Sequence, residues 1–316
     1  MQEDFSEIKL FAGSASPKLA AEVAKILGIA VSKAKIGKFS DGENFVDILE
    51  SVRGKDVFLI QSTSTPVNAS YMQLFLMLDA LKRASSHKLN LILPYYGYSR
   101  QDRLVGRSPL SASLIAHFLQ EAGAQSFLSV DLHSATIQGF FDIPTDNLSP
   151  TTLFAEYFKK KGISGKEVTV VSPDVGGVKR ARNLARKLDA KLAVIDKHRP
   201  KANQSELGHV VGEVEGKICV LCDDIVDTGG SLVNAAEALK SKGATKVYAA
   251  VTHGVLSGGA QQKISSSPAL EELVITNSIE HSKLEPKIST VSLAPAIAEA
   301  IKCIYFHKSL SQALEL

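Results

Sequence analysis

Short apolar runs alternate with longer amphipathic stretches along nearly the whole chain. The short runs predict strands near residues 8–11, 56–61, 89–93, 126–131, 168–172, 192–196, 218–222, 246–251, 273–276 and 289–292. The longer stretches repeat apolar residues every three or four positions and predict helices near residues 17–28, 67–84, 110–122, 150–161, 177–188, 231–242 and 294–305. This alternation is typical of parallel sheets flanked by helices, so we expect an α/β fold.

A polar, turn-rich stretch at residues 144–150 (PTDNLSP) lies near the middle of the chain. The chain has 316 residues, of which 45% are apolar, and this is enough for two domains that each bury a core. We therefore predict a first domain over residues 1–147 and a second domain over residues 148–302.

Charge and the spread of apolar residues exclude several classes of protein. The net charge of +3 is too small to indicate a nucleic-acid-binding or membrane-binding protein, and no apolar run approaches the ~18 residues that span a bilayer. The amino terminus is acidic and shows no signal peptide. Cys219, Cys222 and Cys303 fit small core residues better than zinc or redox chemistry. We expect a cytoplasmic protein that binds neither nucleic acid nor membrane.

Polar residues gather directly after several predicted strands. These clusters are residues 95–103, 131–133, 172–177 and 196–200. Open α/β sheets bind ligands in the crevice at the carboxyl ends of their strands. Clusters that follow several strands therefore indicate one composite site.

Residues 217–231 (KICVLCDDIVDTGGS) hold the most informative pattern. We expect the strand to end before a carboxylate pair, Asp223 and Asp224, which could accept hydrogen bonds from sugar hydroxyls or hold a Mg2+ hydration shell. The following turn offers amides, hydroxyls and a helix N-terminus to an anion, through Asp227, Thr228, Gly229, Gly230 and Ser231. A phosphate cradle beside a diol acceptor describes a pentose 5-phosphate site. The alternative is an ordinary strand–turn–helix junction with solvated acids.

Four other polar residues each allow a functional and a structural interpretation. Lys197 and Arg199 follow a strand and could stabilise charge on a transferring phosphoryl group, or they could form a solvated basic loop. His133 could ligate a metal or cap a buried turn. Asp174 offers a hard oxygen ligand before a helix and is equally suited to cap that helix.

Residues 39–43 (FSDGE) place an aromatic ring beside two carboxylates across a glycine turn. Such a turn could stack a nucleobase on Phe39 and bind its amine through Asp41 or Glu43, but a simple hairpin turn explains the pattern equally well. The predicted helix 177–188 is basic on one side, where we expect a solvated face formed by Lys179, Arg180, Arg182, Arg186 and Lys187.

Several segments together resemble the ribose-phosphate pyrophosphokinases. These segments are residues 40–43 (SDGE), 51–54 (SVRG), 95–103 (YYGYSRQDR), 131–133 (DLH), 137–144 (IQGFFDIP), 172–177 (SPDVGG), 195–200 (IDKHRP) and 223–231 (DDIVDTGGS). The last segment alone also resembles the type I phosphoribosyltransferases. The resemblance implies two phosphoribosyltransferase-like domains, each a mainly parallel sheet flanked by helices, with residues 303–316 packing back on the first domain.

The resemblance also implies roles for individual residues. Residues 227–231 would hold the 5-phosphate, Asp223 and Asp224 the ribose hydroxyls, and His133 and Asp174 would serve Mg2+. Lys197 and Arg199 match the catalytic pair of the family, and Arg199 would also contact ribose 5-phosphate. The ATP site would be formed, in part across a subunit boundary, by Phe39, Asp41, Gly42, Glu43, Arg100, Gln101 and Asp102. A regulatory phosphate site between subunits would be formed by Ser51, Arg53, Arg83, Ser85, Ser309 and Ser311.

The expected activity is transfer of diphosphate from Mg-ATP to ribose 5-phosphate by a homo-oligomer built from dimers, such as a hexamer. Two alternatives are a type I phosphoribosyltransferase and a non-catalytic regulatory subunit that binds active synthetase subunits. Two segments depart from the family pattern: the loop after Arg103 is shorter and less basic, and residues are missing after Leu148. Both departures concern the regulatory site and the oligomer contacts rather than the catalytic residues.

Overall fold

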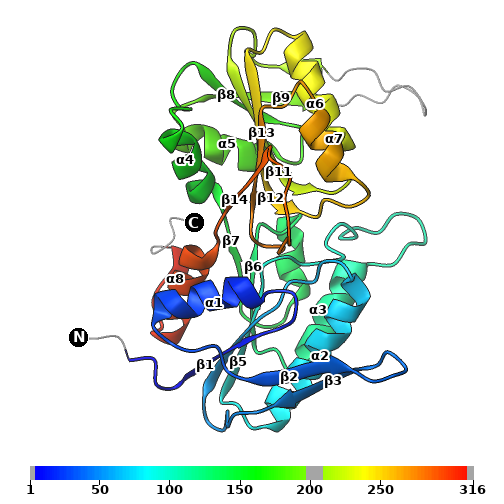
Figure 1. Cartoon of the computed structure of the whole chain (residues 1–316), viewed down its shortest axis with the longest axis vertical. Coiled ribbons are helices and arrows are strands. Elements are labelled where there is room, and N and C mark those ends of the chain that lie inside the picture. The colour runs from blue at the N-terminus through cyan, green and yellow to red at the C-terminus, as the bar shows by residue number, and fades with distance from the viewer. Residues whose placement is uncertain (1–3, 197–208, 312–316) are drawn as a thin grey trace. The chain divides into compact units, whose positions relative to one another are not determined.

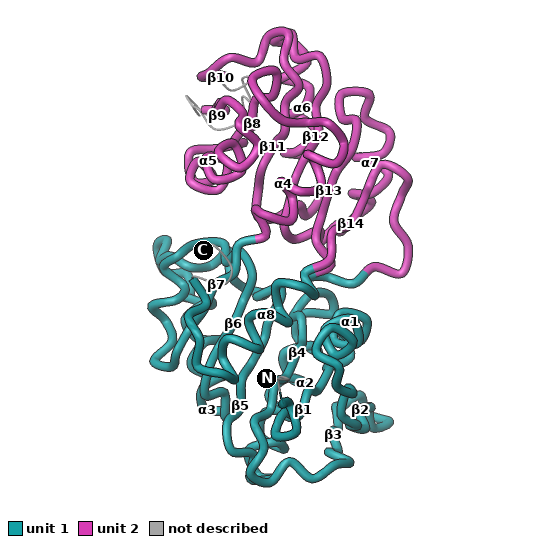
Figure 2. The backbone as a smooth tube through the Cα atoms, turned by 90° about the vertical axis from the view of Figure 1, so that its left-hand side faces the viewer, with its two compact units in different colours: residues 1–149, 278–280, 293–316 teal, residues 150–277, 281–292 magenta. Residues whose placement is uncertain are grey.

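The computed structural model describes residues 4–196 and 209–311 of the chain. The fold consists of two compact units (Figure 2). Unit 1 contains Met1–Ser149, Ser278–Glu280 and Leu293–Leu316, and unit 2 contains Pro150–Asn277 and His281–Ser292. From the sequence we predicted that the first domain ends at residue 147 and the second domain at residue 302.

Unit 1 is built on a parallel sheet with the strand order β1-β4-β5-β6-β7 (Figure 1; β4 is labelled in Figure 2). Its strands are β1 (Ile8–Ala12), β4 (Asp56–Ile60), β5 (Lys88–Leu93), β6 (Ser126–Val130) and β7 (Thr145–Leu148). Its helices are α1 (Pro17–Leu27), α2 (Val67–Arg83), α3 (Ser111–Ala122), the 3-10 helix η1 (Ala135–Phe140) and α8 (Ala294–Tyr305). Helices α2 and α3 bury Leu74, Met77 and Leu119 in one core with Leu59 and Leu91 of the sheet. Helix α1 packs against α8 and β1.

Helix α1 explains why the short segment around Glu280 belongs to unit 1. Pro17 begins the helix with its fixed φ, and Gly28 ends it in the left-handed conformation with φ 71°. Glu280 Oε1 accepts hydrogen bonds from the N–H groups of Lys18 (2.7 Å) and Leu19 (3.1 Å). A carboxylate at a helix N-terminus satisfies amides that have no partner within the helix, and the helix dipole favours its charge.

Unit 1 also contains an antiparallel hairpin, whose two strands we did not predict from the sequence. Strands β2 (Ala34–Lys38) and β3 (Asn44–Ile48) pair with each other, and β3 packs on α2. Residues 39–43 form the turn between them, so the hairpin-turn interpretation of this segment is confirmed. Gly42 at the tip has φ 95°, a conformation that glycine adopts readily.

Unit 2 is built on a second sheet with the strand order β10-β9-β8-β11-β12-β13-β14, in which β10 alone runs antiparallel to its neighbour. Its strands are β8 (Val168–Ser172), β9 (Lys191–Asp196), β10 (His209–Val211), β11 (Ile218–Val226), β12 (Lys246–Gly254), β13 (Glu272–Thr276) and β14 (Ile288–Val291). Its helices are α4 (Thr151–Lys160), α5 (Val178–Lys187), α6 (Gly230–Ser241) and α7 (Ala260–Ser266).

The sheet of unit 2 carries a hydrophobic core on each face. Cys219 of β11 lies in the core that includes α6 and α7, and Cys222 lies in the core that includes α4 and α5. The two thiols therefore point to opposite sides of the sheet, as expected for residues three apart on a strand. All three cysteines are buried and free, and burial raises the pKa of the Cys219 thiol to about 11. The prediction that they are core residues is confirmed.

The boundary between the two units, after Ser149, falls within the predicted joint at residues 144–150, although this stretch also contains β7, which pairs with β6 in unit 1. One prediction about local structure was wrong. Strand β11 does not end before the carboxylate pair, because it continues to Val226 through pairing with β12. Strand β10 and helix α7 were also not predicted. Among the described residues, no helix is both long and apolar enough to cross a membrane.

Candidate active site

The acidic pair of unit 2 lies in the last part of β11. Asp223 and Asp224 extend beyond Leu221, the last β11 residue that pairs with β8, while β12 continues alongside them on the other edge. Asp224 is buried, Asp223 is partly exposed, and the N–H of Asp224 donates to Asp223 Oδ1 at 2.9 Å. The strand extension thus holds two adjacent carboxylates in a fixed backbone conformation at the carboxyl edge of the sheet.

The turn after β11 forms a candidate anion site. Gly229 adopts the left-handed conformation with φ 75°, and helix α6 begins at the next residue, Gly230. A Cβ on Gly229 would lie 3.2 Å from two side-chain atoms of Ile264, so a larger residue would require this α7 side chain to shift. Thr228 and Ser231 are exposed beside these glycines. Amides at a helix N-terminus and exposed hydroxyls are the donors that a phosphate group requires.

Segment 257–263 lies beside this turn. Ser257 Oγ donates a hydrogen bond to Asp227 Oδ1 and so helps to orient that carboxylate. Lys263 Nζ and Thr228 Oγ1 each lie 4.0 Å from the position that a Cβ on Gly230 would occupy. The turn therefore has a lysine ammonium group near its glycines, which adds positive potential for an anion.

The loop between β8 and α5 borders the acidic pair. Asp174 Oδ1 accepts a hydrogen bond from the N–H of Gly177 at 3.0 Å, and Ser172 Oγ donates to the carbonyl oxygen of Asp174 at 2.7 Å. A Cβ on Gly177 would lie 2.8 Å from Ser172 Oγ, so a side chain here would displace the hydroxyl that donates to Asp174. The side chain of Asp174 thus stabilises the start of α5, while the residue itself stays exposed.

Arg180, in the first turn of α5, faces both carboxylates of the acidic pair. Its Nη1 lies 3.9 Å from Asp223 Oδ1 and 3.6 Å from Asp224 Oδ1. Burial and the neighbouring Asp224 raise the pKa of Asp223 to about 8, and the Arg180 guanidinium opposes this rise. We expected Arg180 to be part of a solvated basic face, and for this residue the expectation was wrong.

The predicted catalytic pair cannot be placed in this geometry. Strand β9, the neighbour of β8, ends at Asp196. Lys197 and Arg199 lie outside the described residues. Their roles remain predictions from the sequence.

In unit 1, the predicted ATP residues follow β5 and occupy a well-supported turn. Gly97 donates its N–H to Thr63 Oγ1 at 2.8 Å, and its carbonyl oxygen accepts from the Tyr71 hydroxyl at 2.7 Å. Arg100 and Gln101 are exposed after this turn, and Gln101 Oε1 accepts from Ser111 Oγ. Asp102 is only 8% exposed. Arg100 and Gln101 are accessible to a ligand, whereas Asp102 is a mainly buried residue.

The hairpin turn presents an accessible aromatic ring. Phe39 is 58% exposed, and its ring centroid lies 5.1 Å from that of Phe45. Asp41 Oδ1 accepts a hydrogen bond from the N–H of Glu43 at 3.0 Å, and both acidic residues are exposed. The turn thus combines one open aromatic face with two carboxylates, as the nucleobase hypothesis requires.

The two predicted metal ligands belong to different units. His133 follows β6 in unit 1 and is exposed, whereas Asp174 belongs to unit 2. Among residues 4–196 and 209–311, no group of three or more His, Cys, Asp or Glu side chains is arranged to hold a metal ion. Mg2+ that keeps most of its water and phosphate ligands takes only one or two protein carboxylates, and the exposed carboxylate of Asp174 is a ligand of this kind.

The predicted regulatory residues are exposed on the surface of unit 1. The N–H of Gly54 donates to the carbonyl oxygen of Ser85 at 3.0 Å, which joins the loop of Ser51 and Arg53 to the turn of Ser85. Arg83 Nε pairs with Asp79 Oδ2 at 2.7 Å on α2. Ser309 and Ser311 place their hydroxyl oxygens 3.0 Å apart.

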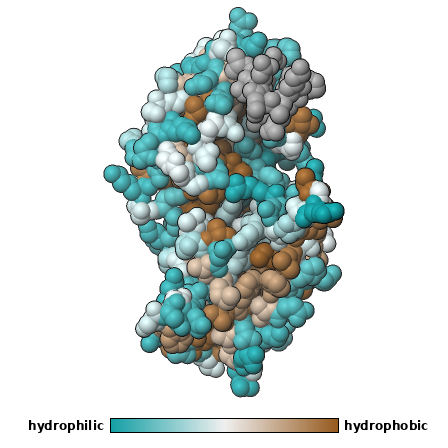
Figure 3. Space-filling model, turned by 90° about the vertical axis from the view of Figure 1, so that its right-hand side faces the viewer, coloured by the Kyte–Doolittle hydropathy of each residue, from teal (hydrophilic) through white to brown (hydrophobic). Residues whose placement is uncertain are grey.

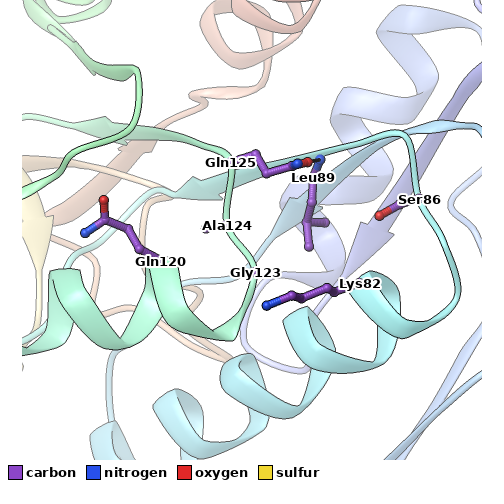
Figure 4. A pocket seen from close by; sticks show the side chains of 7 residues that line it. All are labelled: Lys82, Ser86, Leu89, Gln120, Gly123, Ala124 and Gln125. Carbon is purple, nitrogen blue, oxygen red and sulfur yellow. Dashed lines mark hydrogen bonds between the residues drawn. The ribbon is translucent and has the colours of Figure 1, made fainter.

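A small surface pocket of about 200 Å³ lies near the end of α2, and Figure 4 shows its lining residues. Lys82 Nζ donates to the carbonyl oxygen of Glu121 at 3.3 Å, and Gln125 Oε1 accepts from the N–H of Leu89 at 2.8 Å. Gln120 Oε1 accepts from the N–H of Asp142 at 2.7 Å. Because these polar groups serve the fold, we do not assign a ligand to this pocket.

Comparison with known proteins matches both units to one family. Residues 8–123 match the N-terminal domain of ribose phosphate pyrophosphokinase, and residues 207–315 match a phosphoribosyl synthetase-associated domain. A ribose-phosphate pyrophosphokinase of Clostridium perfringens is 50% identical over 315 residues, covering 98% of this chain and 98% of its own. The Bacillus caldolyticus enzyme is 51% identical over 309 residues, covering 96% and 97% respectively. A crystal structure of phosphoribosylpyrophosphate synthetase from Mycobacterium smegmatis is 41% identical, with a TM-score of 0.89 over 95% of this chain and 99% of that chain. The fold class expected from the sequence is confirmed.

Proposed function

Because the chain belongs to the ribose-phosphate pyrophosphokinase family, we propose that it transfers the β,γ-diphosphate of Mg-ATP to the C1 hydroxyl of ribose 5-phosphate. The products are 5-phosphoribosyl 1-pyrophosphate and AMP. The observation that supports this most directly is the glycine turn after β11, which lies next to the acidic pair and begins helix α6.

Ribose 5-phosphate binds at the carboxyl edge of the unit 2 sheet. Its phosphate receives hydrogen bonds from amides and hydroxyls of residues 227–231 at the start of α6. Its vicinal hydroxyls donate to the carboxylates of Asp223 and Asp224, which β11 holds side by side. This arrangement holds the 5-phosphate and the vicinal hydroxyls of the sugar and leaves its C1 hydroxyl accessible for the reaction.

ATP binds through residues of unit 1. Phe39 supplies an open ring for adenine, and the carboxylates of Asp41 and Glu43 accept hydrogen bonds from its amine. Arg100 and Gln101 contact the phosphates from the turn after β5. In the oligomer, the hairpin turn serves a site that a second subunit completes.

The chemistry requires positioning and charge neutralisation rather than a covalent enzyme intermediate. The C1 oxygen attacks the β-phosphorus, the bond from that phosphorus to the α-phosphate oxygen breaks, and the hydroxyl proton is released. Lys197 and Arg199 stabilise the charge on the transferring group, and Arg199 also contacts ribose 5-phosphate. His133 and Asp174 would hold Mg2+, which would supply neutralisation of the phosphate charge when bound. Lys197→Ala should therefore reduce kcat by about 100-fold or more and leave ribose 5-phosphate binding intact.

The protein functions as a cytoplasmic homo-oligomer built from dimers, with a regulatory phosphate site that contains Ser51, Arg53, Arg83, Ser85, Ser309 and Ser311. Helices α2 and α3 of unit 1 expose large apolar side chains, including Met72 (52% exposed), Leu114 (49%) and Phe118 (48%). Figure 3 shows hydrophobic side chains gathered on the lower part of one face, which belongs to unit 1. Such a patch supports an interface with a second copy.

The activity is tested by incubating the purified protein with ATP, Mg2+ and ribose 5-phosphate and separating the nucleotides by chromatography. We expect AMP to form only when all three are present. A phosphoribosyltransferase would form no AMP under these conditions. A regulatory subunit would form none alone but would change the rate of an active synthetase on mixing.

A further inference from the structure

Arg180 occupies an unusual position for a basic residue on a helix. It lies in the first turn of α5, which contains no acidic residue. The dipole of a helix disfavours a cation at its N-terminus by about 0.3–1 kcal/mol at exposed sites. The position of Arg180 therefore does not stabilise the helix through the dipole, and its favourable contacts must lie elsewhere.

Those contacts are with the acidic pair of β11. The Arg180 side chain is 18% exposed, and the side chains of Asp223 and Asp224 are 28% and 8% exposed. The guanidinium Nη1 lies 3.9 Å from Asp223 Oδ1 and 3.6 Å from Asp224 Oδ1. At these separations the contacts are ion pairs rather than hydrogen bonds, and partial burial reduces their screening by solvent.

The guanidinium lies next to the loop between β8 and α5. The position that a Cβ on Gly177 would take lies 3.7 Å from Arg180 Nη1 and 3.8 Å from Asp174 Oδ1. These are ordinary van der Waals distances, so the guanidinium lies directly beside the turn that Asp174 stabilises. Arg180 thus links this turn to the carboxylates of Asp223 and Asp224 on β11.

We propose that Arg180 is a positioning residue of the ribose 5-phosphate site, holding the Asp223–Asp224 pair in the arrangement that accepts the vicinal hydroxyls of the sugar. It acts through the carboxylates. Ionisation of both carboxyl groups is opposed by their mutual repulsion, and a shared cation offsets this repulsion and fixes their directions. This inference rests on the proposed function, because it assigns the acidic pair to the sugar.

The test compares three variants by steady-state kinetics and by calorimetry with ribose 5-phosphate. Arg180→Gln removes the charge, Arg180→Lys keeps it, and Arg182→Gln removes the charge of an exposed residue on the same helix as a control. We expect Arg180→Gln to raise KM and Kd for ribose 5-phosphate about 10- to 100-fold, with kcat and the KM for ATP changed much less. The KM and Kd of Arg180→Lys for ribose 5-phosphate should lie between those of Arg180→Gln and the parent. Those of Arg182→Gln should match the parent.

A second comparison shows whether Arg180 acts through the acidic pair. In the Asp223→Asn background, Arg180→Gln should weaken ribose 5-phosphate binding much less than it does in the parent. The inference is overturned if Arg180→Gln binds ribose 5-phosphate like the parent. It is also overturned if Arg180→Gln and Arg180→Lys each lower kcat, the affinity for ribose 5-phosphate and the affinity for ATP to the same extent. If the parent protein itself binds no ribose 5-phosphate and forms no AMP, the proposed function fails instead.

Discussion

Gly229 lies directly against Ile264: a Cβ on Gly229 would be 3.2 Å from both Cδ1 and Cγ1 of that side chain. Gly229 also has φ 75°, a region that residues with a side chain rarely adopt. The turn that we assign to the 5-phosphate therefore depends on glycine for two separate reasons.

Gly229→Ala should lower both the stability and the affinity for ribose 5-phosphate. Left-handed strain and the close contact with Ile264 together should cost about 1–3 kcal/mol of unfolding free energy. Gly216→Ala is the matched control, because Gly216 also has a positive φ of 70° but has nothing within 4 Å of its Cβ position. Gly216 precedes β11, so it lies at the end of this strand opposite to the turn of Gly229. Calorimetry should show weaker binding for Gly229→Ala alone. Equal binding by the two variants would contradict the assignment of the turn.

Asp223 should make the stability of the protein depend on pH. Its pKa in the fold is about 8, against 3.8 as its ordinary value. Between these values the folded protein holds a proton that the unfolded chain releases, so this group's contribution to stability is present at low pH and is lost as the pH rises to about 8.

Asp223→Asn should remove this dependence and also weaken the binding of ribose 5-phosphate to a measurable extent. The variant should match the parent near pH 4 and be more stable by about 1–3 kcal/mol above pH 8, measured by thermal unfolding without ligands. The asparagine Oδ1 can still accept the hydrogen bond from the N–H of Asp224. A stability difference that stays constant across this pH range would contradict the burial of this carboxyl group.

The alternation of apolar runs was sufficient to predict both parallel sheets, because strands buried on both faces are nearly continuous in Val, Ile and Leu. It was insufficient for elements that are half-buried or polar. Strand β7 is the four-residue segment TDNL at the edge of its sheet, and β2 is AKIGK, which contains two lysines and a glycine. Their pairing depends on a neighbouring strand rather than on their own composition.

The same limit applies to the site. The acidic pair and the glycine turn are contiguous in sequence, so their chemistry is visible in one segment. Arg180 contacts carboxylates that are more than 40 positions away, and the pattern of its helix favours a solvated face. Ser257 likewise contacts Asp227 from another segment. A basic residue in the first turn of a helix, where the dipole disfavours it, was the available signal for Arg180.

Ser257 should affect the sugar phosphate through Asp227 rather than directly. Ser257→Ala removes the hydroxyl that donates to Asp227 Oδ1 and should raise the KM for ribose 5-phosphate about 3- to 10-fold, with the KM for ATP unchanged. Ser266→Ala is the control, because its hydroxyl donates to the carbonyl oxygen of Lys263 at the end of α7. Equal kinetic effects of the two substitutions would show that Ser257 has no specific role.

Phe39 should contribute to ATP binding and not to stability, since its ring is 58% exposed. Phe39→Ala should raise the KM for ATP about 5- to 50-fold by removing a stacking surface worth about 1–3 kcal/mol per base. Phe39→Tyr keeps the ring and should retain most of the affinity. Unchanged ATP kinetics in Phe39→Ala would exclude the hairpin turn from the nucleotide site.

Transfer of an intact diphosphate is the central claim, and the fate of the individual ATP phosphates tests it most directly. The protein is incubated with Mg2+, ribose 5-phosphate and ATP that is radiolabelled in its α- or its γ-phosphate, and the products are separated. We expect the α label in AMP and the γ label in 5-phosphoribosyl 1-pyrophosphate, in equal amounts. An α label in ADP, with the γ label in a sugar bisphosphate or in free phosphate, would contradict the claim.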